Sequence, residues 1–537
     1  MDQEAKAMFV WVARRKATFA LVTTAVSAAV LAGATPADVS RSSASAPVLV
    51  YGINSVASNV SPIASGGTVY LNPLGLETLM KLGPNGQPQP NLAQSVGHPT
   101  GVTYIYHLRR GVKFWDGNEM TSADVANAIN YARFPSFITS AYFTNVKSVK
   151  ATARYTVTIT LKRPDAAWEW TLTQQGFVFE KKFQDQHRAT MGNPGTLIEG
   201  TGPFKFDSLD PTSGAELSAN PNYWGGKVGI KHISVKFFSS DTNAALAFRA
   251  GALDVYFPAD PHAFQATSGT AVKLAPGISS QYFSMDTQAR PWSDVHVRRA
   301  VAYALNRKDL IQAATGGIGS PNYTIIPYPL LRTVASKAEV NALIRSLPTY
   351  RHNLAEAKKE LAKSAYPQGF EAPLYTFTFG TYVQTNQVIV DELAQIGIKL
   401  DLTVVPLGQY VQMVYSGGGH QDKYGAMYSR WIPLSPDLGY IPELGLNGKR
   451  VTATLQNMAA YSNPKVDRLL IAGDSTADPA KRFAAYSAIL RIVAADVPYV
   501  PLFAQPNAVV LSNKFKWPSF NAYSSNRLPF LLQLGTN

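Results

Sequence analysis

Residues 104–132, YIYHLRRGVKFWDGNEMTSADVANAINYA, combine a strand, a turn and a helix, and they decide the fold class of the chain. Apolar and polar residues alternate from Tyr104 to Arg109, which predicts a half-buried strand. Thr121, with Asp124 three residues later, is typical of a helix start. The apolar residues after it recur at helical spacing, at Val125, Ala128, Ile129 and Ala132. The segment therefore predicts a hairpin followed by a helix.

Strands and helices alternate along the rest of the chain. The patterns predict strands over residues 48–51, 155–161, 233–237, 283–286 and 400–404. They predict helices over 295–306, 354–365, 384–396, and from Asp478-Pro479 to a stop before Pro498. Strands alternating with helices of this length indicate an α/β fold built on sheets.

Length and composition indicate a large globular protein. A chain of 537 residues exceeds what one hydrophobic core supports, so we expect two or three domains. The net charge of +14 is scattered in isolated basic pairs, and no nucleic-acid recognition motif accompanies it. We therefore expect no nucleic-acid partner.

The N-terminal residues have the layout of a secretory signal. Lys6 and the basic run 14–16 precede the uncharged, alanine-rich stretch 17–34, and small residues follow. We expect residues 1–46 to be a signal peptide and linker, with residues 35–37 as one plausible cleavage end. The alternative is an uncleaved anchor, because about 18 apolar residues approach the length of a membrane span.

Cysteine is absent from the sequence. No disulfide, thiol nucleophile or cysteine-based metal site can form, and no cysteine is available for lipid attachment. We expect an exported protein of the periplasm or extracytoplasmic cell envelope that is not a lipoprotein.

Motifs that carry catalysis are missing as well. The eight histidines have no zincin spacing, and there is no nucleophile elbow, phosphate loop or dinucleotide fingerprint. We expect no catalytic residue, no metal and no cofactor, and hence no enzyme. A secreted hydrolase stays open as an alternative, because paired carboxylates can meet in space from distant parts of a sequence.

An aromatic group surrounds one glycine-rich loop. Tyr415, Tyr424, Tyr428 and Trp431 flank the glycines 417–419, which are followed by His420. Aromatic rings beside polar groups suit a cleft that stacks on a ligand and orients it. His420 is a candidate for a metal or ligand contact.

An ordered series of motifs resembles one family along most of the chain. The chain is similar to the peptide/nickel-type substrate-binding proteins (family 5) of ABC importers, which include the dipeptide and oligopeptide binders. The resemblance rests on residues 108–117, 121–125, 200–204, 220–224, 251–254, 298–305, 354–370, 397–400 and 498–502, taken in this order.

The resemblance implies an α/β, two-lobed periplasmic-binding-protein fold of type II (Venus flytrap) with an extra inserted subdomain. Lobe I would combine residues 47–75, 198–280 and 500–537. The inserted subdomain would span 76–197, and lobe II would span 281–499. Such a protein would be a monomer that captures a small peptide or peptide-like ligand between its lobes and delivers it to the permease subunits of an ABC transporter.

The resemblance also suggests where the ligand would make contact. One part is the loop 61–68, with Ser65, Gly67 and Thr68, and the other is the strand 428–437, with Tyr428, Arg430, Trp431 and Asp437.

One position departs from the family pattern. Peptide binders of the family commonly hold the ligand's amino group with an aspartate three residues after the cleft tryptophan, where this chain has Leu434. Asp437 is a candidate substitute, and Arg430 suits an anionic group. A chelated metal or a sugar-like solute is therefore an alternative ligand on the same fold.

Overall fold

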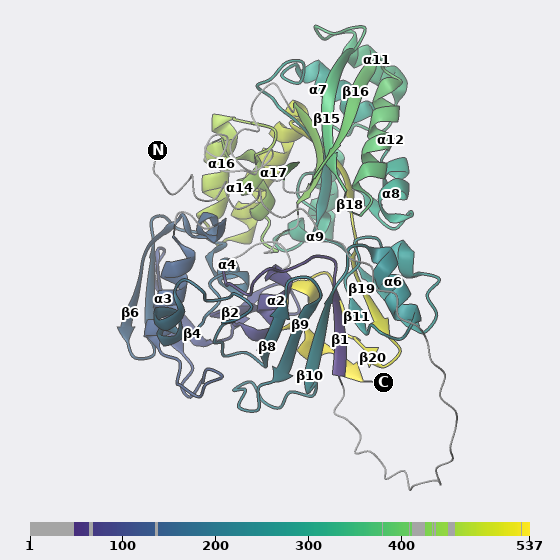
Figure 1. Ribbon diagram of the computed structural model, residues 1–537. Coiled ribbons are helices and arrows are strands. Elements are labelled where there is room, and N and C mark those ends of the chain that lie inside the picture. Colours follow the sequence, from purple (N-terminus) through teal and green to yellow (C-terminus); the bar gives the residue numbers. More distant parts are fainter. Residues whose placement is uncertain are drawn as a thin grey trace, which may run out of the picture. The chain divides into compact units, whose positions relative to one another are not determined.

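The computed structural model describes residues 48–63, 68–134, 138–378, 380–406, 409–410, 425–431, 433, 436–448, 457–527 and 529–536. Three sheets of four or more strands organise this part of the chain, beside three two-stranded sheets (Figure 1). Several predictions lie outside the described residues: the signal peptide, Ser65, Gly67, Tyr415, His420, Tyr424 and Leu434.

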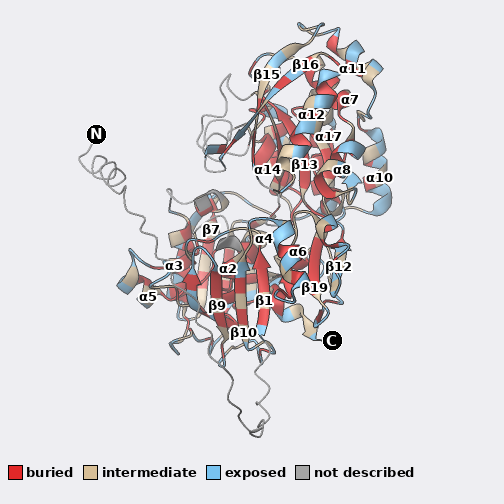
Figure 2. Cartoon of the chain, turned by 45° about the vertical axis from the view of Figure 1, so that its right-hand side comes forward, coloured by how far each residue is buried: buried red, intermediate tan, exposed pale blue. Residues whose placement is uncertain are grey.

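The first sheet has seven strands that come from distant parts of the sequence. In spatial order they are β12 (Thr270–Ala275), β19 (Asn507–Ser512), β11 (Val255–Tyr256), β1 (Val48–Ile53), β10 (His232–Phe237), β9 (Gly214–Ala219) and β8 (Phe204–Asp210). β1 pairs in parallel with both β10 and β11. The near-continuous apolar run VLVYGI suits this central place, since a parallel strand is buried on both faces. Figure 2 shows β1 and its neighbours mostly buried.

The second sheet has four antiparallel strands. Their order is β14 (Ser320–Pro321), β18 (Tyr499–Ala504), β13 (Ser280–Met285) and β17 (Ala426–Trp431). All six residues of β13 are buried, because it lies between two strands and under helices.

Helices and a parallel strand pair cover the second sheet. They are α7 (Val295–Ala304), α8 (Arg307–Thr315), α9 (Tyr328–Leu331), α10 (Lys337–Ser346), α11 (Leu354–Leu361), β15 (Phe370–Phe377), α12 (Tyr382–Ala394), β16 (Ile398–Val405), α14 (Tyr440–Leu446), α16 (Pro464–Asp474) and α17 (Pro479–Asp496).

The third sheet contains the stretch that opened the sequence analysis. Its order is β4 (Ala93–Thr100), β5 (Thr103–Leu108), β7 (Thr156–Leu161) and β6 (Val146–Ala153), with helix α3 (Ser122–Ala132) packed beside it. The backbone N–H of Thr121 donates to the carboxylate of Asp124 at 2.9 Å, which starts α3 as predicted. The predicted strand, turn and helix are confirmed.

Shorter elements complete the chain. They are α2 (Thr68–Gly75), β2 (Met80–Leu82), β3 (Pro88–Pro90), α4 (Trp168–Gln174), α5 (Lys181–His187), α6 (Asp241–Arg249), β20 (Phe515–Lys516), β21 (Gly535–Thr536), and the 3-10 turns at Ile138–Phe143, Pro261–Phe264, Ser524–Asn526 and Phe530–Gln533. In the described part of the chain, no helix has the length and apolar character needed to cross a membrane.

The chain forms two lobes, one on the first sheet and one on the second, and the third sheet belongs to a subdomain inserted into the first lobe. Two segments cross between the lobes, from β12 to β13 and from β18 to β19. β18 stays in the second sheet as far as Ala504, so the crossing falls after the predicted division at residue 500. The residue boundaries of the lobes otherwise remain a prediction.

The two crossing segments lie directly against each other. A Cβ atom at Gly277 would lie 1.6 Å from the carbonyl oxygen of Gln505, so only glycine allows this approach. The side chain of Gln505 accepts a hydrogen bond from Gln281 of β13 at 3.1 Å and donates one to the carbonyl of Ala259. Side chains of the second sheet are thereby tied to the first lobe.

Candidate ligand pocket

A cavity of about 170 Å³ opens at the carboxyl ends of two strands of the first sheet. Ile53 and Asn54 line it where β1 ends, and residues 257–259 line it where β11 ends. Ligands of open α/β sheets bind at this edge, because loops diverge there and leave a crevice. The crossing residues 277–279 and 505–508 complete the wall, so the cavity lies beside the connections between the lobes.

Aromatic rings form one wall of the cavity. The rings of Tyr51 and Phe530 lie 5.5 Å apart, and Phe257 meets Phe530 edge to face at 5.2 Å. Tyr70, from the helix that begins at Thr68, also lines the cavity. Burial raises the pKa of Tyr51 well above its usual value, so this phenol stays neutral. The wall offers stacking surface without charge.

Amide and hydroxyl groups also line the cavity. They belong to Asn54, Ser279, Gln505, Asn507, Ser525 and Asn526. Asn507 donates from its amide to the carbonyl of Asn521 at 3.1 Å, which fixes its orientation. A cavity with an apolar wall and a few convergent polar groups is typical of a small-molecule site.

Arg430 is the one Asp, Glu, Lys or Arg among the described residues that line the cavity. It belongs to β17, where its register partner on β13 is Gln281. Beyond residue 47, the stretches outside the described residues contain a single acidic residue, Asp422. The cavity therefore combines a positive charge with an otherwise neutral lining.

Tyr428 and Trp431 are not on the cavity wall. Tyr428 is 2% exposed, and its hydroxyl donates to Gln281 at 3.2 Å. Trp431 is 5% exposed and stacks on Tyr282, with ring centroids 3.9 Å apart. Both rings serve the core of the second lobe here. Neighbouring residues of a strand point to opposite faces, so Arg430 and Trp431 do not share the cavity.

Asp437 is not on the wall either. It is 2% exposed, and its carboxylate forms an ion pair with Arg482 at 2.7 Å. Arg482 is itself buried, so removing either partner would leave a buried charge alone. The structure therefore does not place Asp437 as a substitute partner for a ligand amine. Thr68 begins α2 next to the cavity, and its ligand contact, like those of Ser65 and Gly67, stays a prediction.

Several lining residues escaped the sequence analysis. Asn54 could have been found from its place after the predicted strand 48–51. Phe257 follows β11, a two-residue strand that the sequence patterns do not predict. Phe530 and Asn526 had no such signal, because they come from irregular structure near the end of the sequence. In the described residues, no three His, Cys, Asp or Glu side chains gather into a metal site.

Comparison with known proteins gives a consistent result. Residues 87–450 match the model of the bacterial extracellular solute-binding proteins, family 5. The glutathione-binding protein GsiB of Escherichia coli (strain K12) is 26% identical over 423 residues, which cover 75% of this chain and 78% of GsiB.

Solved structures share the fold. The ABC transporter-associated periplasmic binding protein DppA of Helicobacter pylori, in complex with the peptide STSA, superposes with a TM-score of 0.78 and 23% identity, covering 91% of this chain and 98% of DppA. AgaA of A. tumefaciens R10, in complex with agropinic acid, superposes with a TM-score of 0.78 and 22% identity. The match covers 91% of this chain and 99% of AgaA. The family model spans well over half of the sequence. The chain therefore belongs to the bacterial extracellular solute-binding proteins of family 5.

Proposed function

We propose that this protein is the solute receptor of an ABC importer and captures a small acidic peptide or peptide-like solute in the cavity beside the crossing segments. The observation that carries the proposal is the cavity itself, with an aromatic wall, an amide-rich edge and Arg430. A ligand that contacts both lobes stabilises the closed form by its differential affinity for that form. Permease subunits in the membrane could then distinguish loaded from empty receptor.

The size of the cavity supports a small ligand. A cavity of roughly 150 Å³ accommodates a molecule such as benzene, and this one measures about 170 Å³. The space suits a small ligand rather than a long peptide. Glutathione, the tetrapeptide STSA and agropinic acid, the ligands named for the three relatives, are all small.

The charge of the cavity supports an acidic ligand. An ammonium group needs a carboxylate or several acceptors to replace its hydration, and no acidic side chain is present among the described lining residues. A carboxylate, by contrast, can form charge-assisted hydrogen bonds with the guanidinium of Arg430. The sequence also has Leu434 in place of the family's amine-binding aspartate, which likewise favours an acidic ligand over one with a free amine.

A second candidate is an acidic solute that is not a peptide. The same charge pattern favours it, and agropinic acid in AgaA is an example on the same fold. The chelated-metal alternative rests on Leu434 in place of the family's aspartate, and its candidate contact, His420, lies outside the described residues. We further propose that the protein is exported by residues 1–46, acts as a monomer and releases its ligand unchanged.

The test of the proposal is native mass spectrometry of the protein purified from its own host, followed by denaturation to identify the released compound. A bound short acidic peptide supports the first candidate. A single non-peptide acid supports the second, and a basic or metal-containing ligand contradicts both. Recovery of the ligand intact after long incubation excludes a hydrolase.

Arg430 gives the sharpest mutational test. We expect Arg430→Ala to weaken binding of the released compound by roughly 10- to 100-fold, because a hydrogen bond to a charged group is worth about 1.5–3 kcal/mol. Isothermal titration calorimetry measures the change. Lys399→Ala is the control, since Lys399 is an exposed residue of the same lobe. Unchanged affinity in Arg430→Ala would contradict the proposed role.

A further inference from the structure

The inserted subdomain contacts the second lobe away from the ligand cavity. The backbone N–H of Ala166, just before α4, donates to the carbonyl oxygen of Asp474 at the end of α16, at 2.6 Å. Close to it, the hydroxyls of Tyr142 and Tyr440 lie 3.3 Å apart. We call these two contacts the interlobe contact. It joins parts of the chain that must separate when the lobes open.

Carboxyl groups gather at the interlobe contact. Asp165 belongs to the inserted subdomain, while Asp437, Glu443 and Asp474 belong to the second lobe. Asp474 is buried, and its carboxylate accepts a hydrogen bond from Tyr486 of α17 at 2.5 Å. A Cβ atom at Gly439 would lie 2.7 Å from the Asp474 carboxylate and 3.0 Å from that of Asp437, so these two groups lie close together. Asp165 directly precedes Ala166, whose N–H reaches the carbonyl of Asp474.

Two guanidinium groups act on these carboxyl groups: Arg163 of the inserted subdomain lowers the pKa of Asp165, and Arg482 of the second lobe pairs with Asp437. Arg482 holds Asp437 with two short contacts, at 2.7 and 3.0 Å, and donates its remaining Nε–H to the carbonyl of Gly473 at 3.2 Å. Its charge is matched by Asp437. A negative charge on the buried Asp474 carboxylate is therefore repelled by the charges of Asp165 and Glu443.

The pKa of Asp474 is raised to about 8, mainly by burial and then by the neighbouring charges of Glu443, Asp437 and Asp165, against the hydrogen bond from Tyr486. Burial also raises the pKa of Asp165, with the charge of Asp437 as an additional cause. When the lobes separate, Asp165 and the segment 165–167 leave Asp474, so two causes of the shift weaken.

We propose that the interlobe contact is proton-linked: the Asp474 carboxyl takes up a proton as the inserted subdomain docks on α16, so that acid favours the closed form and alkali favours the open one. The direction follows from linkage. A carboxyl with a higher pKa in the closed form than in the open form binds more protons when closed. The closing equilibrium constant then falls by up to about tenfold for each pH unit between the two pKa values.

The absence of cysteine allows a direct test on the full chain without ligand. Cysteines at Lys150, on the inserted subdomain, and Lys358, on the second lobe, are both at exposed positions for spin labels. Pulsed electron-spin distance measurements between about pH 6 and about pH 9 report the fraction of closed protein. We expect this fraction to decrease as the pH rises. A pH-independent distance distribution overturns the proposal.

Variants distinguish the effect of protonating Asp474 from the effect of the interlobe contact itself. Asp474→Asn should abolish the pH dependence and leave the protein closed at alkaline pH. Glu392→Gln is the matched control, because burial also raises the pKa of Glu392 to about 8, but its carboxylate accepts the backbone N–H of Asn306 inside the second lobe. The control should respond to pH like the parent. A parent-like pH response in Asp474→Asn overturns the proposal.

Two further variants keep the proposal testable if Asp474→Asn does not fold. Asp165→Asn removes the charge on the opposite side and should make the pH dependence shallower. Tyr142→Phe removes a hydroxyl of the contact and should lower the closed fraction at every pH without changing its slope. Parent-like behaviour of both variants contradicts the proposal. Because no ligand is used, this result is independent of the proposed ligand class.

Discussion

At the scale of single residues, Glu77 is a buried carboxyl that accepts hydrogen bonds from three side chains. Thr201 and Trp224 donate to one oxygen at 2.9 and 2.8 Å, and Tyr223 donates to the other at 3.1 Å. Burial nevertheless raises the pKa of Glu77 to about 7, from 4.5 for an ordinary glutamate. The folded protein therefore favours the protonated form.

This shift predicts how stability depends on pH. The folded pKa lies above the unfolded one, so the contribution of Glu77 is fully present below pH 4.5 and is lost as the pH rises through 7. The loss amounts to about 3 kcal/mol. We expect the melting temperature of Glu77→Gln to fall less steeply than that of the parent over this range. Parallel curves in thermal scans would contradict the assignment.

For the strand that carries Arg430, the sequence predicts ligand contacts without assigning them to a face of the strand. The aromatic residues around the glycine loop are predicted together because stacking groups suit a cleft. A strand turns successive side chains to opposite faces, however, so Trp431 and Arg430 could not both face the cavity. The sequence does not say which face of a buried strand meets the cleft, since both faces of β17 carry apolar and polar residues.

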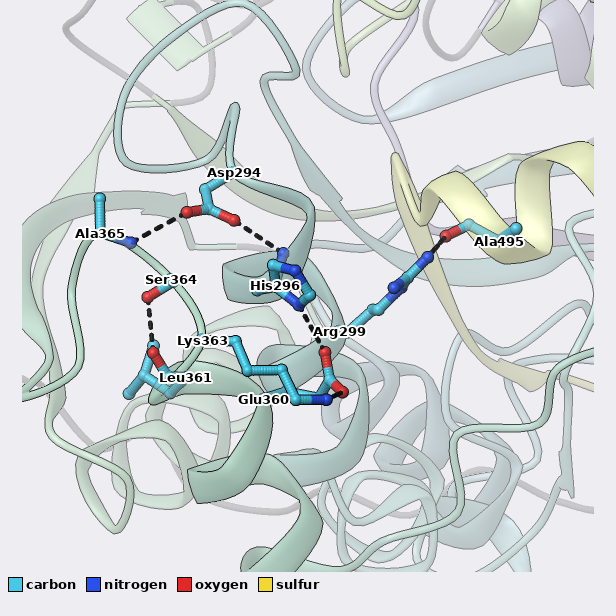
Figure 3. Close-up of polar contacts among 9 residues, drawn as sticks. All are labelled: Asp294, His296, Arg299, Glu360, Leu361, Lys363, Ser364, Ala365 and Ala495. Atoms are coloured by element: carbon cyan, nitrogen blue, oxygen red, sulfur yellow. Dashed lines mark hydrogen bonds and ion pairs between the residues drawn. The ribbon is translucent and has the colours of Figure 1, made fainter.

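At the scale of elements, polar side chains tie α7 to α11 (Figure 3). His296 of α7 contacts the carboxylate of Glu360 at 2.8 Å, and Lys363 reaches the other oxygen of this carboxylate at 2.6 Å. Asp294, which caps α7, also accepts the backbone N–H of Ala365 at 3.1 Å. The two helices are therefore joined in two ways, through the capping residue Asp294 and through the side-chain contact between His296 and Glu360.

We expect His296→Ala to destabilise the second lobe by about 1.5 kcal/mol, the lower end for a hydrogen bond to a charged group, because the histidine is partly exposed. The Glu360 side chain is only 12% exposed, so water replaces the histidine poorly. The control is Lys399→Ala, whose ion pair with Glu371 is 73% and 77% exposed and should contribute little. Equal melting temperatures of the two variants would contradict this expectation.

Elements were the level at which the sequence was most informative. The helix predicted from Asp478-Pro479 begins there, because the carboxylate of Asp478 accepts the backbone N–H of Ala480 at 2.9 Å and the proline needs no partner for a missing N–H. It ends at Asp496, before Pro498. Helix-capping signals of this kind depend only on neighbouring residues, so they can be recognised in the sequence. Of the seven strands of the first sheet, the sequence predicts only two, at 48–51 and 233–237, and the order of the strands depends on contacts between distant residues.

At the scale of the whole molecule, the two crossing segments govern how the lobes move. We expect Gly277→Ala to cost about 2 kcal/mol or more, because the new methyl group would collide with the backbone at Gln505. The same change should weaken ligand binding by altering the closed geometry, as calorimetry can show. Gly195→Ala is the control, since no atom lies within 4 Å of the position of its Cβ. Identical stability and affinity in both variants would contradict the role of Gly277.

The resemblance to a family predicted the two-lobed fold, which the residue patterns alone could not. The cavity brings Tyr51 together with Phe530, which are separated by almost the whole chain. Periodicity reports which residues are buried, not which buried segments meet. The composition of the pocket therefore had to come from the structure.

The order of strands in the first sheet also bears on how the protein is made. β12, near residue 270, joins this sheet only through β19, which comes more than 230 residues later. A chain still attached to the ribosome therefore has an unpaired strand and an open sheet edge until residue 512 has been synthesised. The first lobe begins at the start of the folded region, yet it is completed among the last parts of the protein. A nascent chain of this kind stays incompletely folded throughout its synthesis, and a product that terminates before β19 would expose that edge to proteases and to other chains.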